Sequence, residues 1–220
     1  NLIAATDIVG NVTPSVARDF SLAIQSIGMT AASLLIIGLK IKIEKNAIYY
    51  GSLGGLIGFL LGSYWLYDLI PTGNLKLIFA STWLSFGFAL WLVNRNKNRK
   101  TSFYISDLRN IDKLKIIFFG IMGGCMTSFF GSGIDIMIFC LLTLHFNLSE
   151  KTATPTSVIL MTINTLIGFF FHLFIAQDIE HITFSYWLAA VPVVALGAPL
   201  GAFIVNKLSR NSIANLLYII

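Results

Sequence analysis

Long apolar blocks dominate the sequence: at least six of them approach twenty residues in length, and short polar links separate them. A bilayer core about 30 Å thick requires roughly 20 apolar residues for one spanning helix, so these blocks have the length of membrane spans. Only 11% of the residues are charged, whereas a soluble domain carries about 25%. Strand edges find no hydrogen-bond partner in lipid. The sequence therefore predicts an all-α fold, a polytopic transmembrane helix bundle.

The apolar blocks and the polar links predict where the helices begin and end. We expect helices over residues 14–39, 46–70, 74–94, 113–131, 134–146, 152–177 and 183–206, with a further helix beginning near Asn211. The helix over 134–146 is too short to cross a bilayer upright. It is therefore expected to form a re-entrant hairpin with the helix before it.

The basic residues predict the orientation of the chain in the membrane. The net charge is +5, and thirteen of the fifteen Lys and Arg residues lie in or beside every second link between consecutive predicted helices. If the helices alternate in direction, all thirteen lie on one side, which the positive-inside rule assigns to the cytoplasm. The chain is thus expected to be an integral, multi-pass protein of the cell or plasma membrane, and nucleic acid is not an expected partner.

Short similarities between the two halves predict an internal repeat. Residues 17–26 align with residues 153–162, and the Gly-x-x-x-Gly spacing at 58–62 recurs at 197–201. The charge pattern gives the matched helices opposite orientations, which is the inverted-repeat arrangement of secondary transporters. Glycines at these spacings are expected to allow close contact between helices.

The repeat divides the chain into three parts. Residues 1–94 form a first repeat, residues 95–112 a basic cytoplasmic loop, and residues 113–220 a second repeat. The chain begins without methionine and ends inside an apolar run, so both repeats are expected to be cut. The first repeat's counterpart of the hairpin is then expected to precede residue 14.

A glycine-rich break, Gly131-Ser132-Gly133, interrupts the second half. Glycine lets the backbone open, and the N–H groups at a helix N-terminus can hold an anion. A tight turn between packed helices is the alternative. Asp135 follows the break as the one acid predicted well inside the bilayer, where an ionisable group is a candidate for function. It is predicted to carry a proton or to bind a coupled cation, and a helix N-cap is the alternative.

Polar residues on the first and sixth predicted helices extend this candidate site. Ser21 and Gln25 are one turn apart and share a helix face. Thr156 and Ser157 belong to a Thr-Pro-Thr-Ser sequence that is expected to open its helix, because proline suits a first turn; an ordinary N-terminal cap is the alternative. Asn164 lies on the same face as Ser157, and it is expected to bind substrate or a neighbouring helix.

The remaining polar residues suggest no enzyme. Arg18 and Asp19 are expected to pair at the outer surface, where long side chains snorkel to water, and attraction of an anionic substrate by Arg18 is the alternative. Neither the two cysteines nor the three histidines show a metal-ligand spacing, so no metal and no cofactor is expected. No nucleophile–base pair and no nucleotide-binding loop is found, which argues against catalysis.

The order of these motifs resembles the TauE/SafE sulfite-exporter family. That family has a glycine-rich G-x-G-G-G motif, then an apolar hairpin, then a helix that opens A-x-x-T-S-L. The chain has Gly-Ser-Gly-Ile-Asp at 131–135, an apolar hairpin, and Ala-Thr-Pro-Thr-Ser-Val at 153–158, with a weaker copy at 17–22. Ile134 and Asp135 replace two glycines of the family pattern, and an acid beside an anion site repels the anion unless it is protonated or paired.

The resemblance implies a transporter that exports small sulfur-containing anions, sulfite or organosulfonates. The predicted place of Asp135 inside the bilayer adds the expectation of proton coupling. A small anion and the lipid bilayer are the expected partners, and a homodimer is left open. A membrane assembly factor or receptor that uses this fold without transport is the alternative. The residues predicted to bind substrate are Ser21, Gln25, Gly131, Ser132, Gly133, Thr156, Ser157 and Asn164.

Overall fold

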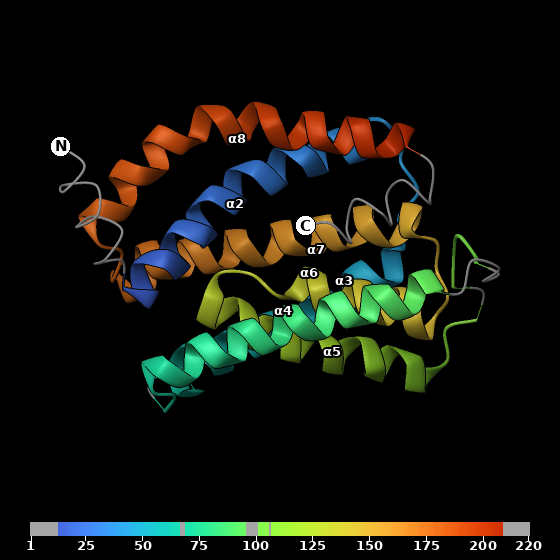
Figure 1. The fold of residues 1–220 in the computed structure, drawn as a ribbon, viewed down its shortest axis with the longest axis horizontal. Coiled ribbons are helices and arrows are strands. Elements are labelled where there is room, and N and C mark those ends of the chain that lie inside the picture. Colours follow the sequence, from blue (N-terminus) through green and yellow to red (C-terminus); the bar gives the residue numbers. More distant parts are fainter. Residues whose placement is uncertain (1–12, 67–68, 96–100, 106, 209–220) are drawn as a thin grey trace.

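The computed structural model describes residues 13–66, 69–95, 101–105 and 107–208, which form a bundle of elongated helices (Figure 1). Three helices continue into short π-helical segments: η1 (Gly62–Leu66) after α3, η2 (Leu141–His145) after α6, and η3 (Phe171–Ala176) after α7. In chain order the helices are α2 (Pro14–Gly38), α3 (Lys45–Leu61), α4 (Thr72–Arg95), α5 (Asn110–Phe130), α6 (Ile134–Cys140), α7 (Glu150–Phe170) and α8 (His181–Lys207).

The all-α fold predicted from the sequence is confirmed, and the seven helices expected within the described residues are all present. Two bounds differ from the prediction by three residues or more. The helix expected over 46–70 ends at Leu66, because Pro71 disfavours a helical backbone at the residue before it. The helix expected from 113 begins at Asn110, because the Asp112 carboxylate accepts the Arg109 N–H at 3.3 Å in a capping box. The helix predicted near residue 211 lies outside the described residues.

Several of these helices are suited to a bilayer. Four helical stretches in the described part of the chain are long and apolar enough to cross a membrane, and the apolar stretches Leu77–Phe88 and Ile134–His145 are shorter. The four are Pro14–Gly38, Asn110–Phe130, Glu150–Ala176 and His181–Ile204. The chain is therefore an integral, multi-pass membrane protein. As predicted, the segment after the glycine break is too short to span upright.

Glycines on α3 bring that helix into backbone contact with α5. A β-carbon at Gly54 or Gly58 would overlap carbonyl oxygens of α5, so only glycine allows this approach. This is the close packing predicted for glycines at membrane-helix spacing. The same expectation is not met on α8, because a β-carbon at Gly197 or Gly201 would find no described atom within 4 Å outside its own helix backbone.

The helices alternate in direction along the bundle. Figure 1 shows α2, α4 and α8 running one way and α3, α5 and α7 the other. Contacts fix the antiparallel pair α2 and α7: Arg18 meets His172, and further along α2 the Ser33 hydroxyl lies 2.7 Å from the Thr162 hydroxyl. The helix ends that flank the predicted basic links consequently gather at one end of the bundle.

Two parallel pairs complete the packing. Gly28 of α2 packs against Val194 of α8, and Gly55 of α3 packs against Asn164 of α7. The short α6 lies in a hairpin with α5 and fits between α5 and α7, where its Ile134 is fully buried. The glycine break at the tip of this hairpin is thereby brought against α2.

Candidate functional site

The glycine break ends α5 and begins α6 through two unusual backbone conformations. Gly131 has φ +73° and its N–H donates to the Thr127 carbonyl at 2.8 Å, a left-handed helix cap. Gly133 has φ +144°, a value that side chains rarely tolerate. A β-carbon on Gly131 would lie 2.6 Å from the Arg18 carbonyl oxygen and 2.6 Å from Ser21 Cβ. Glycine at 131 is thus needed both for the turn and for contact with α2.

Gln25 joins α2 to the break. Its Nε2 donates to Ser21 Oγ at 2.6 Å and to the Gly131 carbonyl at 3.1 Å. Three residues predicted from the sequence are therefore brought together, although Gln25 and Gly131 lie 106 positions apart. Ser132 lies half-buried between the two glycines. An amide, two hydroxyls and the backbone of a helix break are groups that can orient a small polar ligand.

Asp135 is a buried acid close behind the break. It is the second residue of α6, and Gly133 occupies the N-cap position, so the N-cap alternative for Asp135 is wrong. Its Oδ1 is buried and has no hydrogen-bond partner among the described residues. A carboxylate near a helix N-terminus interacts favourably with the helix dipole. The unpartnered oxygen gives Asp135 an atom at which a proton could be accepted.

The remaining predicted residues lie elsewhere on α7. The Thr156 hydroxyl donates to the Thr152 carbonyl at 2.7 Å and accepts the Glu44 N–H at 2.9 Å, which ties α7 to the start of α3. Ser157 donates to its own helix. Gly168, which packs against Leu22 of α2, lies eleven residues beyond Ser157, about 17 Å along the helix. The antiparallel course of α2 and α7 separates their N-terminal residues.

Asn164 lies between these two regions. It is 1% exposed, its Nδ2 donates to the Leu160 carbonyl at 3.3 Å, and its Oδ1 has no partner among the described residues. The amide fills the space beside Gly55. The structure therefore places Asn164 in the contact between α3 and α7 and not in the cluster around Gln25.

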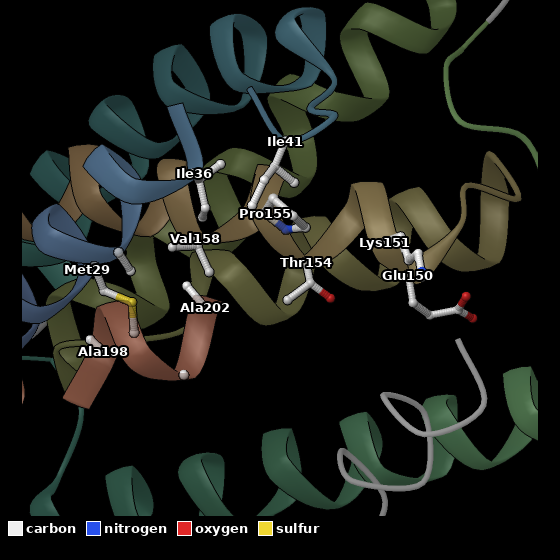
Figure 2. A pocket seen from close by; sticks show the side chains of 12 residues that line it. Met29, Ile36, Ile41, Glu150, Lys151, Thr154, Pro155, Val158, Ala198 and Ala202 are labelled. Carbon is white, nitrogen blue, oxygen red and sulfur yellow. The ribbon is translucent and has the colours of Figure 1, made fainter. Parts of the chain in front are cut away.

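The start of α7 differs from the prediction. The helix begins at Glu150, capped by Ser149, so Pro155 lies inside the helix and not in its first turn. An apolar cavity of about 260 Å³ adjoins this part of α7, and Figure 2 shows Glu150 and Lys151 at the opposite end from Met29 and Ala198. Its lining is Met29, Ala32, Ile36, Ile41, Glu150, Lys151, Thr154, Pro155, Val158, Ala198, Gly201 and Ala202.

A buried charge network lies next to the break. Arg18 Nε donates to Asp19 Oδ1 at 2.7 Å, and Arg18 Nη2 donates to Asp178 Oδ2 at 3.2 Å. His172 Nδ1 lies 2.8 Å from Asp178 Oδ1. Arg18, Asp19 and His172 are 4%, 1% and 2% exposed. The predicted Arg18–Asp19 pair is present, and both side chains are buried beside His172 of η3 and Asp178 of the link before α8.

Asp178 lies outside the membrane-spanning helices, in the link between α7 and α8. Partial burial favours the neutral carboxyl, but the hydrogen bond with His172 and the charge of Arg18 outweigh it and hold the pKa of Asp178 below its usual range. The Asp178 carboxylate is therefore ionised and binds α2 to this link.

The comparison with family models decides the class of protein to which this arrangement belongs. The model of the sulfite exporter TauE/SafE family matches residues 6–220. The chain belongs to this family. Comparison with curated proteins found no match, and comparison with solved structures found none. The TauE/SafE family is a family of membrane transporters, in agreement with the multi-pass bundle.

Sequence reasoning missed the network around Arg18, the most extensively paired charge cluster beside the break. The Arg18-Asp19 pair inside an apolar segment was a visible signal. The partners His172 and Asp178 lie 154 and 160 positions away. No local pattern in this TauE/SafE protein could have assigned them to Arg18.

Proposed function

We propose that the chain is a secondary transporter that exports small sulfur-containing anions such as sulfite or organosulfonates. The observation that carries this proposal is the bridge from Gln25 to Ser21 and Gly131 at a helix break beside an arginine. A bound anion would exchange these internal hydrogen bonds for bonds to its own oxygens, and bonds to a charged ligand are the stronger kind. Membership of the TauE/SafE family supports a sulfur anion as substrate.

Two helix contacts support the inverted repeat on which alternating access would depend. In the alignment of the two halves, Gly28 corresponds to Asn164, and Val194 corresponds to Gly55. Gly28 packs against Val194, and Asn164 packs against Gly55. Both contacts therefore join the same two positions of the repeat alignment, with the first and second repeats interchanged. We infer that residues 1–94 and 113–220 are related by inversion, with the loop over 95–112 between them. Rocking of one repeat against the other would expose the site to each side in turn.

The same inversion relates Thr156 and Ser157 to positions on α2 near the cluster around Gln25. Ser157 is the counterpart of Ser21, and it lies on the antiparallel partner of α2. We propose that Thr156, Ser157 and Asn164, nearer the cytoplasmic, basic end of the bundle, bind the anion before it reaches the cluster around Gln25. Ser132 and Gly133 would contribute the hydroxyl and backbone groups of the break.

Asp135 is proposed to couple the flux to protons. A carboxylate in a bilayer interior is costly when ionised, and Asp135 Oδ1 has no partner among the described residues. Protonation would also remove the repulsion between this acid and an anion at the break. Asp135→Asn keeps the shape of the side chain but cannot ionise, so the response of efflux to a pH gradient should become weaker.

The function is tested with purified protein in liposomes loaded with radiolabelled sulfite. We expect protein-dependent efflux that responds to a pH gradient. Ser21→Ala removes one hydrogen bond to a charged ligand, worth about 1.5–3 kcal/mol, and should raise the half-saturating sulfite concentration about tenfold or more. Ser81→Ala is the matched control, because Ser81 is exposed and its hydroxyl bonds only within α4. Equal kinetics for the two variants would contradict the site, and absence of efflux with the unaltered protein would contradict the function.

A further inference from the structure

The network of Arg18, Asp19, His172 and Asp178 is adjacent to the proposed anion site, and the proposed transport function does not itself require it. Arg18 and Ser21 are one turn apart on α2, and both lie against Gly131, whose β-carbon would overlap the Arg18 carbonyl and Ser21. The network joins the start of α2 to the start of η3 and to the link before α8. An arginine that is buried among ionisable partners beside an anion site can bind that anion only if the partners release it.

We propose that this network is a proton-linked anion site, in which a proton taken up by His172 releases Arg18 from Asp178 to bind the sulfur anion. The inference rests on the proposed transport function and adds to it a second titratable group, separate from Asp135. Arginine suits this role because its planar guanidinium matches the oxygen atoms of an oxyanion.

The geometry of His172 defines where the proton binds. Nδ1 lies 2.8 Å from Asp178 Oδ1, so in the neutral ring Nδ1 carries the hydrogen and donates it to that carboxylate. Nε2 then holds the lone pair, is buried, and has no hydrogen-bond partner among the described residues. Nε2 is therefore the atom at which a proton would be added, and the resulting imidazolium would attract Asp178 more strongly.

Charge balance then links the proton to the anion. With a neutral His172, the four described residues of the network carry one guanidinium and two carboxylates, an excess of one negative charge that disfavours an incoming anion. A proton on His172 neutralises this excess, and one bound monovalent anion restores it. Proton and anion should therefore bind together, because each lowers the electrostatic cost of the other.

The groups that face His172 come from three sides. α2 contributes Arg18 and Asp19, and the link before α8 contributes Asp178. α3 contributes the uncharged ring of Phe59, whose centroid lies 6.0 Å from that of His172. Asp19 Oδ2 is buried without a partner among the described residues, so a carboxylate oxygen is available to balance an imidazolium. The described surroundings can thus accept the proton without a further acid.

The test uses the full chain in detergent and measures methanesulfonate binding by calorimetry between about pH 5 and pH 8, the range in which histidine titrates. This sulfonate stays ionised throughout, so any pH dependence belongs to the protein. We expect the affinity of the unaltered protein to fall with rising pH, by up to tenfold per pH unit for one linked proton. His172→Gln should reduce this slope, and the double variant with Asp135→Asn should show none, because Asp135 is the other proposed proton site.

A second variant keeps the inference testable if His172→Gln fails to fold. Asp178→Asn removes one negative charge and leaves Arg18 only a neutral, weaker acceptor, so it should bind methanesulfonate more tightly than the unaltered protein at about pH 8 and with a smaller slope. Glu180→Gln is the matched control: it removes the same charge from the same exposed link, outside the described network, and should leave affinity and slope unchanged.

The outcomes separate this inference from the proposed function. An equal slope in folded His172→Gln and in the unaltered protein overturns the inference, as does equal behaviour of Asp178→Asn and Glu180→Gln. Absence of methanesulfonate binding in an unaltered protein that still exports sulfite also overturns it. Absence of both binding and sulfite efflux in the unaltered protein overturns the proposed function itself.

Discussion

Replacing Gly131 by alanine tests whether the break is a strained junction against α2 or an ordinary turn. The substitution places a side chain at φ +73°, and the left-handed conformation costs a non-glycine residue roughly 1–2 kcal/mol. The new β-carbon would also lie 2.6 Å from the Arg18 carbonyl oxygen, a backbone atom that can move only with α2. Overpacking of this kind costs about 1–3 kcal/mol. We therefore expect a loss of about 2–5 kcal/mol in the free energy of unfolding.

The matched control is Gly197→Ala on α8. A β-carbon there would meet no described atom within 4 Å outside the helix backbone, and alanine favours a helix over glycine by up to about 1 kcal/mol. This variant should be as stable as the unaltered protein or slightly more stable. Both free energies are measured by denaturation of the detergent-solubilised protein, followed by tryptophan fluorescence. Equal stabilities for Gly131→Ala and Gly197→Ala would refute the backbone contact between the break and α2.

Two further predictions address α2 and its partners. Ser33→Ala removes the buried 2.7 Å hydrogen bond to Thr162 and should lower the free energy of unfolding by about 0.6 kcal/mol, the average for such bonds between membrane helices; no loss in the same denaturation assay would contradict this bond. The pKa of Asp178 is below its usual range, so the bond between Arg18 and Asp178 should stabilise the fold above about pH 4 and be lost as pH falls through that lowered pKa. Thermal unfolding at a series of acidic pH values should show this loss in the unaltered protein and not in Asp178→Asn, and an identical acid response in both would refute it.

The helix positions were predictable because they depend on local properties of the chain. An apolar block of about twenty residues matches a bilayer wherever it lies in the sequence. Gly131 and Gly133 were recognisable as a break for a similar reason, because their effect on the backbone is local. The cap at Ser149 was also a local signal, but the proline that follows it drew the predicted start of the α7 helix to the wrong turn.

The composition of the candidate site was only partly predictable. Ser21 and Gln25 were grouped correctly, because residues one turn apart share a helix face wherever the helix packs. Ser157 was assigned to the same site because its Thr-Pro-Thr-Ser stretch was expected to open the helix beside the break. The structure separates it from the break, although its sequence aligns with that of Ser21. Similarity between repeats reports an equivalent environment and not proximity, and in antiparallel helices equivalent positions lie toward opposite ends.

By itself, the sequence determined that this chain is a multi-pass membrane protein of the TauE/SafE family, with a helix break and a basic end. Those conclusions follow from residue type and spacing along single helices. The tertiary structure alone decided that Arg18 contacts His172 and Asp178, and that carbonyl groups of α5 pack against the glycines of α3. Such contacts depend on the direction and register of helices distant in the chain, which interhelical packing sets and no single segment encodes.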